Sequence, residues 1–316
     1  MTASPPTYRT PPSAAAADAA SAAATAWTAA TASATASATT TASAATPVPA
    51  PATSAAASPA LLAFDTATER ASIGVAAHGR LWQREIEGGG RASALFLPEV
   101  LGLLAAAGIE LGALDAIAFG RGPGAFTGLR VACAVAQGLA FGATKPVLPI
   151  DTLLAVAEDA RAGASTLRVW AVIDARMDEI YAAEYAFGAA SEGLETGGPA
   201  RSGALDLAAA KPGWRCVVEP HLSSVEALNA RWREAPPSAV AGNALGAFGA
   251  RLECGAARRF AGAAPRPGGL LTLAQRAWAL GQAIDPALAL PLYLRDKVAQ
   301  TTVEREATRR SRTLNG

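Results

Sequence analysis

Cysteine and histidine are scarce in this sequence of 316 residues, which contains three cysteines and two histidines. Cys133, Cys216 and Cys254 lie far apart and form no C-x-x-C pair, and His78 and His221 each stand alone. A structural zinc site needs several sulfur or nitrogen ligands at close spacing, so the pattern argues against one. An odd number of unpatterned cysteines is typical of a reducing compartment, and we expect each to be a small buried hydrophobic residue.

Leucine, isoleucine and phenylalanine are missing from the first sixty residues. Ser, Thr and Pro interrupt every run of Ala, so the segment has neither the compact apolar region of a signal peptide nor a membrane span. It offers too little apolar surface to offset the entropy of ordering, and residues 1–60 are therefore predicted to be a disordered tail. An alternative is that translation starts downstream of Met1 and that the segment is not made.

Excess charge is also absent, because the net charge is +1. This balance gives no whole-protein electrostatic case for nucleic-acid binding, although it leaves room for a local basic patch. Residues 301–316 are predicted to form a flexible basic tail. The arginines of this tail either contact RNA phosphates or, as we favour, remain solvated. They are Arg305, Arg309, Arg310 and Arg312.

Apolar runs that alternate with turns begin at Leu61 and predict an antiparallel meander. Residues 61–65 form a short apolar run, residues 71–76 alternate as a half-buried strand does, and a third strand starts near Leu81. Downstream, apolar runs alternate with helical patterns, which indicates an α/β chain with two sheet-centred lobes. The expected strands cover residues 115–120, 147–150, 168–174 and 180–187.

The expected helices follow from capping signals and spacing. Ser93 is a plausible N-cap for a first helix that ends at Ala107 before Gly108, although Pro98 would then lie past the first turn and the start could be nearer Leu97. The remaining helices are expected over residues 129–141, 153–161, 224–231, 245–253 and 271–283.

Two loops have the composition of a nucleotide site. Asp65, Thr66 and Thr68 lie at the end of a buried strand, where a carboxylate and two hydroxyls can hold a hydrated metal ion and bind phosphate oxygens. A capped turn would contain the same residues. Residues 120–128 join a strand to a helix and are too rich in glycine for a random connector. The loop lacks the Gly-Lys-Ser/Thr of a P-loop. It either approaches an anion or serves as a rigid loop for packing between lobes.

A third polar stretch covers residues 174–179 and follows a buried strand. Carboxylates at the carboxyl end of a strand often line a site in α/β folds. A solvated charged turn is the other interpretation, and we favour it on these residues alone.

The first two expected helices, which end at Ala107 and Phe141, are apolar nearly all round. A surface helix, in contrast, carries one apolar stripe. Each must bury two faces, either inside the monomer or against another subunit. The second interpretation predicts seven interface residues: Leu95, Val100, Leu103, Leu104, Val131, Val135 and Leu139.

Five short stretches resemble the TsaB (YeaZ) family and occur in the same order as in that family. They are distributed along the chain from Leu61 to about Ala299. The block from Gly122 to Arg130, Gly-Pro-Gly-Ala-Phe-Thr-Gly-Leu-Arg, is highly specific. The matching stretches are residues 62–69, 118–130, 136–140, 173–177 with Glu179 and Tyr181, and 291–299.

The resemblance implies a two-lobed actin/Hsp70-like fold (ASKHA, ribonuclease H-like), with one lobe over residues 61–150 and the other over 151–300. It also implies a role in making threonylcarbamoyladenosine in tRNA. TsaB-like proteins pair with TsaD, which transfers threonylcarbamoyl from threonylcarbamoyl-AMP to N6 of an adenosine next to the anticodon. A small ATPase, TsaE, docks on that pair, and TsaB-like proteins also form homodimers.

The resemblance therefore predicts a cytoplasmic subunit that dimerises with and activates TsaD, without catalysis of its own and without a membrane. We expect no cofactor on this chain, ATP and a metal ion in the partner subunits, and contact with tRNA through the complex. The His-x-x-x-His metal motif of TsaD is absent, and residues 92–93 replace a histidine that many TsaB-like chains keep. The loops then become a vestigial or weak nucleotide site: Asp65, Thr66, Gly122, Gly124, Thr127 and Gly128. An ATPase or phosphotransferase of the same superfold is the alternative function.

Overall fold

The computed structural model describes residues 48–49, 58–87, 92–188 and 213–295. Most of the predicted N-terminal tail, the glycines at 88–90 and the predicted tail at 301–316 lie outside these residues. One short segment of the predicted N-terminal tail belongs to the first sheet. Val48–Pro49 forms a short strand, β1, that pairs antiparallel with Leu81 and Arg80 of the third meander strand.

The first sheet has six strands in the order β1-β4-β3-β2-β5-β6. β2, β3 and β4 form the predicted antiparallel meander, and β5 and β6 continue from β2 in parallel. β2 is buried along its whole length, as its unbroken apolar run predicts. The bounds of the strands after β1 are β2 (Leu61–Asp65), β3 (Arg70–Ala77), β4 (Arg80–Glu87), β5 (Ala116–Gly122) and β6 (Val147–Asp151).

The second sheet has the order β11-β10-β7-β8-β9. β7, β8 and β9 again form an antiparallel meander, and β10 and β11 continue from β7 in parallel. Apart from β1, both sheets thus repeat one strand order, which confirms the prediction of two sheet-centred lobes. The bounds are β7 (Leu167–Arg176), β8 (Glu179–Gly188), β9 (Gly213–Ser224), β10 (Ala239–Ala241) and β11 (Arg258–Phe260).

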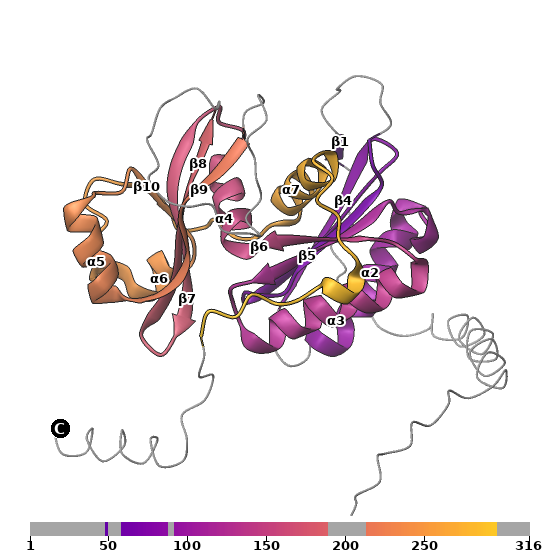
Figure 1. Ribbon diagram of the computed structural model, residues 1–316, viewed down its shortest axis with the longest axis horizontal. Coiled ribbons are helices and arrows are strands. Elements are labelled where there is room, and N and C mark those ends of the chain that lie inside the picture. Colours follow the sequence, from indigo (N-terminus) through magenta and orange to yellow (C-terminus); the bar gives the residue numbers. More distant parts are fainter. Residues whose placement is uncertain (1–47, 50–57, 88–91, 189–212, 296–316) are drawn as a thin grey trace, which may run out of the picture. The chain divides into compact units, whose positions relative to one another are not determined.

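Helices cover both faces of each sheet (Figure 1). One core joins α2 and α3 to the first sheet, a second lies between the sheets around α4 and α7, and a third joins α5 and α6 to the second sheet. The bounds are α2 (Ala92–Ala107), α3 (Phe126–Ala143), α4 (Thr152–Arg161), α5 (Val225–Glu234), α6 (Ala244–Phe248) and α7 (Pro267–Ala279), with 3-10 turns η1 (Leu111–Ala113), η2 (Gly249–Arg251) and η3 (Pro286–Leu288).

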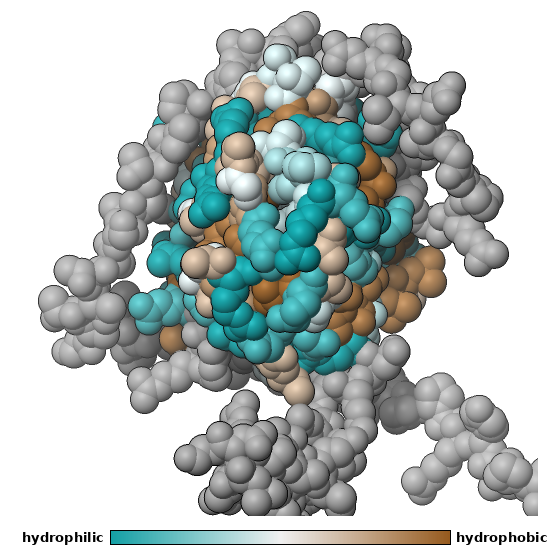
Figure 2. Space-filling model, turned by 90° about the vertical axis from the view of Figure 1, so that its left-hand side faces the viewer, coloured by the Kyte–Doolittle hydropathy of each residue, from teal (hydrophilic) through white to brown (hydrophobic). Residues whose placement is uncertain are grey.

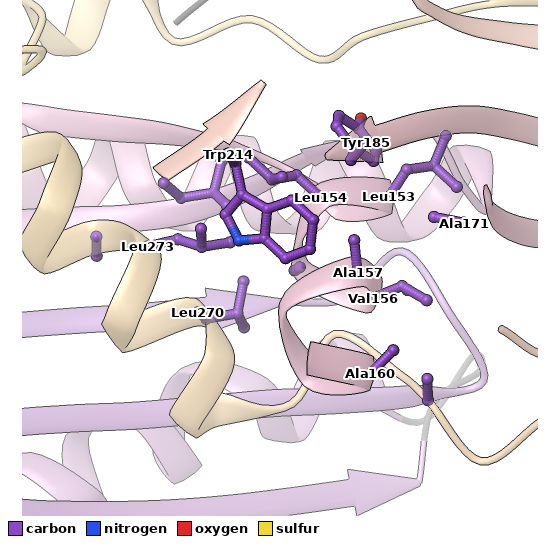
Figure 3. Packing of buried hydrophobic residues seen from close by; sticks show 14 of the residues in the cluster. Leu153, Leu154, Val156, Ala157, Ala160, Ala171, Tyr185, Trp214, Leu270 and Leu273 are labelled. Atoms are coloured by element: carbon purple, nitrogen blue, oxygen red, sulfur yellow. The ribbon is translucent and has the colours of Figure 1, made fainter. Parts of the chain in front are cut away.

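The core between the sheets is where the lobes meet. Figure 3 shows Trp214 of β9 among Leu154 of α4 and Leu270 and Leu273 of α7. The indole Nε1 of Trp214 donates a hydrogen bond of 2.6 Å to Glu158 of α4, which satisfies both buried polar groups. The outer face that carries α5 and α6 is mainly hydrophilic, with smaller hydrophobic areas between the charged side chains (Figure 2).

Two predicted helix starts are wrong. α2 begins at Ala92, so Ser93 is not its N-cap and Pro98 lies inside the helix. Pro98 is exposed, while Phe96 and Val100 on either side of it are buried, and this burial outweighs the backbone hydrogen bond that proline cannot make. α3 begins at Phe126, three residues before the predicted start, so the last three residues of the glycine loop belong to the helix.

Several elements of the second lobe were missed or misjudged. β9, β10 and β11 have no predicted counterpart, and the expected helix over residues 245–253 ends at Phe248, after which a 3-10 turn continues to Arg251. β10 and β11 have three residues each, which is too short for alternation to be detected.

Among the described residues, α3 is the one helix that is long and apolar enough to cross a membrane by length and composition alone. In this fold Leu129, Ala132, Cys133, Ala136 and Ala140 of α3 are buried, and Ala132, Cys133, Ala136 and Ala140 belong to the core of the first lobe. A helix that packs on a sheet passes the same test of composition.

Candidate functional site

A cavity of about 530 Å³ lies where the two lobes meet. Four segments that are far apart in the sequence line it: residues 67–69 after β2, residues 124–126 at the start of α3, residues 173–177 at the end of β7, and residues 292–295 near the end of the described chain. Each of these segments lies in or beside a stretch that sequence analysis singled out. The fold therefore brings together motifs that the sequence presents separately.

Asp65 ends β2 beside this cavity but does not line it, because its side chain is fully buried. The hydroxyl of Thr152 donates a hydrogen bond of 2.7 Å to Oδ2 of Asp65, and the N–H of Ala67 donates one of 2.6 Å to Oδ1. Burial raises the pKa of Asp65 from 3.8 to about 6, although both hydrogen bonds work to lower it. In this arrangement the Asp65 carboxylate fixes the turn after β2 and is not exposed to a phosphate or a metal ion.

The raised pKa of Asp65 predicts a pH dependence of stability. A carboxyl whose pKa is higher in the folded than in the unfolded state stabilises the fold most below pH 4, and this contribution declines as the pH rises towards 6. The decline amounts to about 3 kcal/mol of unfolding free energy. We expect Asp65→Asn to remove it and to be more stable than the parent chain at pH 8, as measured by urea unfolding from pH 4 to 8.

Asparagine keeps an acceptor for the N–H of Ala67, and its amide can donate to the Thr152 oxygen. The conservative change Asp65→Glu is the contrasting variant, because it keeps the charge and overfills the site. An Asp65→Asn variant that retains the full pH dependence would assign that dependence to other groups.

The glycines of the loop before α3 are explained by contact with the turn after β2. A Cβ on Gly128 would lie 1.9 Å from the carbonyl oxygen of Thr66, and a Cβ on Gly120 would lie 1.8 Å from Oδ2 of Asp65. The hydroxyl of Thr66 donates a 2.6 Å hydrogen bond to the carbonyl of Gly128. The space at these two glycines is thus filled by protein, as the packing interpretation of the loop expects.

The other predicted loop residues lie in different environments. Gly122 and Gly124 are buried, and the φ of Gly122 is +108°, a conformation that favours glycine. Thr127 is exposed in the first turn of α3. Of the six predicted nucleotide-site residues, Gly124 lines the cavity itself.

The third polar stretch forms part of the cavity wall. Arg176 donates to Asp174 at 3.0 Å and to Glu69 of the first lobe at 2.9 Å, so its guanidinium links the two lobes. Arg176, Met177 and Asp178 all have positive φ values, between 56° and 64°. The stretch is thus neither a simple carboxylate site nor a turn that faces water throughout.

The segment after η3 was not predicted to contribute to a site. The N–H of Leu292 donates to the carbonyl of Arg121 at 2.7 Å, and the hydroxyl of Tyr293 accepts from Nε of Arg130 at 3.1 Å. Arg295 then reaches the second lobe, where it forms an ion pair with Glu179. This segment crosses from one lobe to the other along the cavity.

Three further cavity residues were missed by sequence reasoning as site residues: Tyr181, Asn243 and Tyr293. Tyr181 belongs to a stretch that carried the family resemblance, as does Tyr293, and that membership was the available signal. Asn243 has no such signal. Its side-chain oxygen accepts from the N–H of Asp174 at 2.9 Å, which fixes the strand end across from α3.

The predicted interface residues divide into two groups. Val100, Leu103 and Leu104 are buried within the chain against the first sheet, so their assignment to a subunit interface needs correction. Their side chains lie on the inner face of α2, where the sheet already covers them. Leu95 is 57% exposed, and three residues of α3 are half-buried: Val131, Val135 and Leu139.

Hydrophobic residues that were not predicted complete the outer surface of these helices. Leu97 and Leu101, one turn apart on α2, are 39% and 36% exposed, and Phe141 of α3 is 58% exposed. We define the α2–α3 apolar face as Leu97 and Leu101 together with Val131, Val135 and Leu139. Both helices pack on the same side of the first sheet (Figure 1).

No group of three or more His, Cys, Asp or Glu side chains that could hold a metal ion occurs in the described ranges. The free cysteines Cys133 and Cys254 are buried, and Cys216 is half-buried. Burial raises the pKa of the Cys216 thiol to about 12, which disfavours the reactive thiolate.

Comparisons with known proteins relate this geometry to one pathway. The profile of TsaD, tRNA N6-adenosine threonylcarbamoyltransferase, matches residues 91–197. The tRNA threonylcarbamoyladenosine biosynthesis protein TsaB of Escherichia coli (strain K12) is 43% identical over 131 residues, which are 40% of this chain and 54% of that protein. The chain thus spans about half the length of the curated relatives named TsaB that it matches.

Longer matches cover both lobes. An uncharacterized protein of Mycobacterium tuberculosis (strain H37Rv) is 34% identical over 240 residues, which are 74% of this chain and 91% of that protein. The solved structure of YeaZ from Pseudomonas aeruginosa is 35% identical, with 75% of this chain and all of that chain covered at a TM-score of 0.60. This similarity confirms the predicted α/β fold with two actin-like lobes.

Proposed function

This chain belongs to the TsaB (YeaZ) family, and we propose on that premise that it is a non-catalytic subunit of the machinery that makes threonylcarbamoyladenosine in tRNA. In this role it pairs with a TsaD-type protein and activates it. The partner transfers threonylcarbamoyl from threonylcarbamoyl-AMP to N6 of the adenosine next to the anticodon. The single observation that carries the proposal is the 35% identity to YeaZ over the whole of that chain.

The α2–α3 apolar face supports the choice of partner surface. Leu97 and Leu101 are apolar and at least one-third exposed, and the half-buried residues of α3 extend the same surface. The TsaD profile matches a region that contains both helices. Two proteins with related helices can pair through equivalent surfaces about a pseudo-twofold axis, as the subunits of a symmetric dimer do.

The state of the Asp65 turn supports a non-catalytic role. Asp65 is buried and hydrogen-bonded within the protein, and the space at Gly120 and Gly128 is taken by residues of the same turn. Phosphoryl transfer needs exposed groups that hold the phosphate and its metal ion. We therefore propose that ATP and the metal ion belong to the partner subunits.

Further partners follow from the same family role. We propose that a TsaE-type ATPase docks on the heterodimer, that the chain forms a homodimer when it is alone, and that tRNA is contacted through the complex. We also propose that the complex acts in the cytoplasm. The free cysteines of the described chain are compatible with a reducing compartment.

Size-exclusion chromatography with light scattering on the full chain, with and without the TsaD-type protein of the same organism, tests the pairing. We expect a one-to-one complex with the summed mass of the two chains. The same samples then enter a threonylcarbamoyl transfer assay, in which TsaD alone should be much less active than the pair. Two separate peaks from two folded and competent proteins would overturn the proposal.

A further inference from the structure

A second group of exposed apolar side chains lies beside α3. Phe141 near the end of α3 is 58% exposed, Leu288 of η3 is 63% exposed and Leu290 is 67% exposed. We call these three residues the η3 apolar patch. The two leucines are the most exposed large hydrophobic side chains of the described residues. Because single apolar residues are common on protein surfaces, this exposure alone does not indicate a partner.

The two leucines are presented by a backbone segment that is fixed against α3. Ala289 between them is fully buried, and its carbonyl accepts from Sγ of Cys133 at 2.8 Å and from Nε2 of Gln137 at 3.1 Å. Gln137 also donates to the carbonyl of Pro286 at 3.3 Å. The segment runs along α3 in Figure 1. A fixed backbone loses little conformational entropy when a partner covers its side chains, which favours binding.

The η3 apolar patch is continuous with the α2–α3 apolar face. Phe141 follows Gln137 by four residues, so both lie on the side of α3 that contacts η3. The next positions round the helix are small and exposed: Ala134, Gly138 and Gly142. Nothing lies within 4 Å of a Cβ placed on either glycine, and no charged residue occurs from Val131 to Ala143. No charge therefore separates the two apolar surfaces.

The α2–α3 apolar face alone is too small for a stable pair of proteins. It consists of five residues, of which the three on α3 are half-buried. A stable interface buries roughly 800 Å² on each partner and takes about 20–30 residues from each side. A partner on this face must also cover neighbouring surface. Of the nine exposed large hydrophobic residues in the described chain, six lie on α2, on α3 or in residues 286–290.

We propose that the TsaD-type partner covers the η3 apolar patch together with the α2–α3 apolar face. The assignment rests on the proposed function, because it extends the pairing surface of that function from two helices to a third segment. The partner surface that fits is apolar, since neither the patch nor the exposed side of α3 beside it contributes a charged side chain.

Isothermal titration calorimetry of the full chain with the TsaD-type protein of the same organism tests the proposal. Leu290→Asp places a carboxylate where the partner would remove water, and we expect it to bind at least about 30-fold more weakly than the parent chain. Leu290→Ala removes apolar contact without adding charge and should bind about tenfold more weakly. Both changes are at an exposed position, and the far-ultraviolet circular dichroism should be unchanged.

Ala230→Asp is the control for the added charge. Ala230 is exposed on α5 of the second lobe, away from the first sheet that α2 and α3 cover. This variant should bind as tightly as the parent chain. Hydroxyl-radical footprinting is the second measurement and needs no substitution. In the complex, Phe141, Leu288 and Leu290 should each be less oxidised than in the chain alone.

The outcomes distinguish this inference from the proposed function. If the parent chain binds the partner and Leu290→Asp binds equally well, the η3 apolar patch lies outside the interface and the pairing itself stands. If Leu290→Asp retains the partner but no longer forms the homodimer, the patch contacts a second copy of this chain, which also overturns the assignment. If the parent chain does not bind, the proposed function fails and this assignment fails with it.

Discussion

Replacing Leu101 with aspartate is expected to abolish pairing with TsaD. Leu101 lies on the α2–α3 apolar face and is 36% exposed in the single chain. In a complex this side chain would be covered, and an unpaired carboxylate would lose its water there. The cost is at least about 3 kcal/mol, which corresponds to at least about 100-fold weaker binding. Light scattering of the mixed proteins should then show two separate species.

Leu280→Asp is the matched control for this change. Leu280 follows α7, far from α2 and α3 in the sequence, and is 37% exposed, so the two substitutions add the same charge at the same degree of exposure. The control should pair as the parent chain does. Both variants should also show the same far-ultraviolet circular dichroism as the parent. Retained pairing of Leu101→Asp would move the interface away from the α2–α3 apolar face.

Sequence reasoning located most elements of the first lobe because its strands and helices carry strong periodic signals. The unbroken apolar run of β2 and the alternation in β3 each predict a strand, and Gly108 marks the end of α2. The same reasoning assigned Val100, Leu103 and Leu104 to an interface. An apolar helix shows how much surface must be covered, but not whether the chain's own sheet covers it.

The start of α3 could not be predicted from sequence, because the glycine in its first turn is required by a tertiary contact and not by a loop conformation. Gly128 looks like a loop residue, yet it lies in the first turn of a helix, where the carbonyl of Thr66 approaches from 62 residues earlier in the chain. The cavity is similar in this respect. Tyr181, Asn243 and Tyr293 come together through the packing of both lobes, and no local pattern relates them.

Gly128→Ala is therefore expected to destabilise the fold more than any other single methyl addition in α3. The added Cβ would lie 1.9 Å from the carbonyl oxygen of Thr66. The position of this carbonyl is held by two neighbouring hydrogen bonds, from the Thr66 hydroxyl to the Gly128 carbonyl and from the Ala67 N–H to Asp65. The contact can be relieved by moving the turn after β2 away from the helix. That movement would disturb the bonds of Asp65 at the end of a buried strand. We expect a loss of about 3 kcal/mol in urea unfolding.

Gly138→Ala is the matched control in the same helix. Nothing lies within 4 Å of a Cβ at Gly138, so this change adds helix propensity without a contact. It should leave the chain as stable as before or up to about 1 kcal/mol more stable. If the two Gly→Ala substitutions change the stability in opposite directions, glycine is required at position 128 because the turn after β2 packs closely against it. If Gly128→Ala were as stable as Gly138→Ala, the turn after β2 would have to be free to move, and the loop could then open towards a ligand.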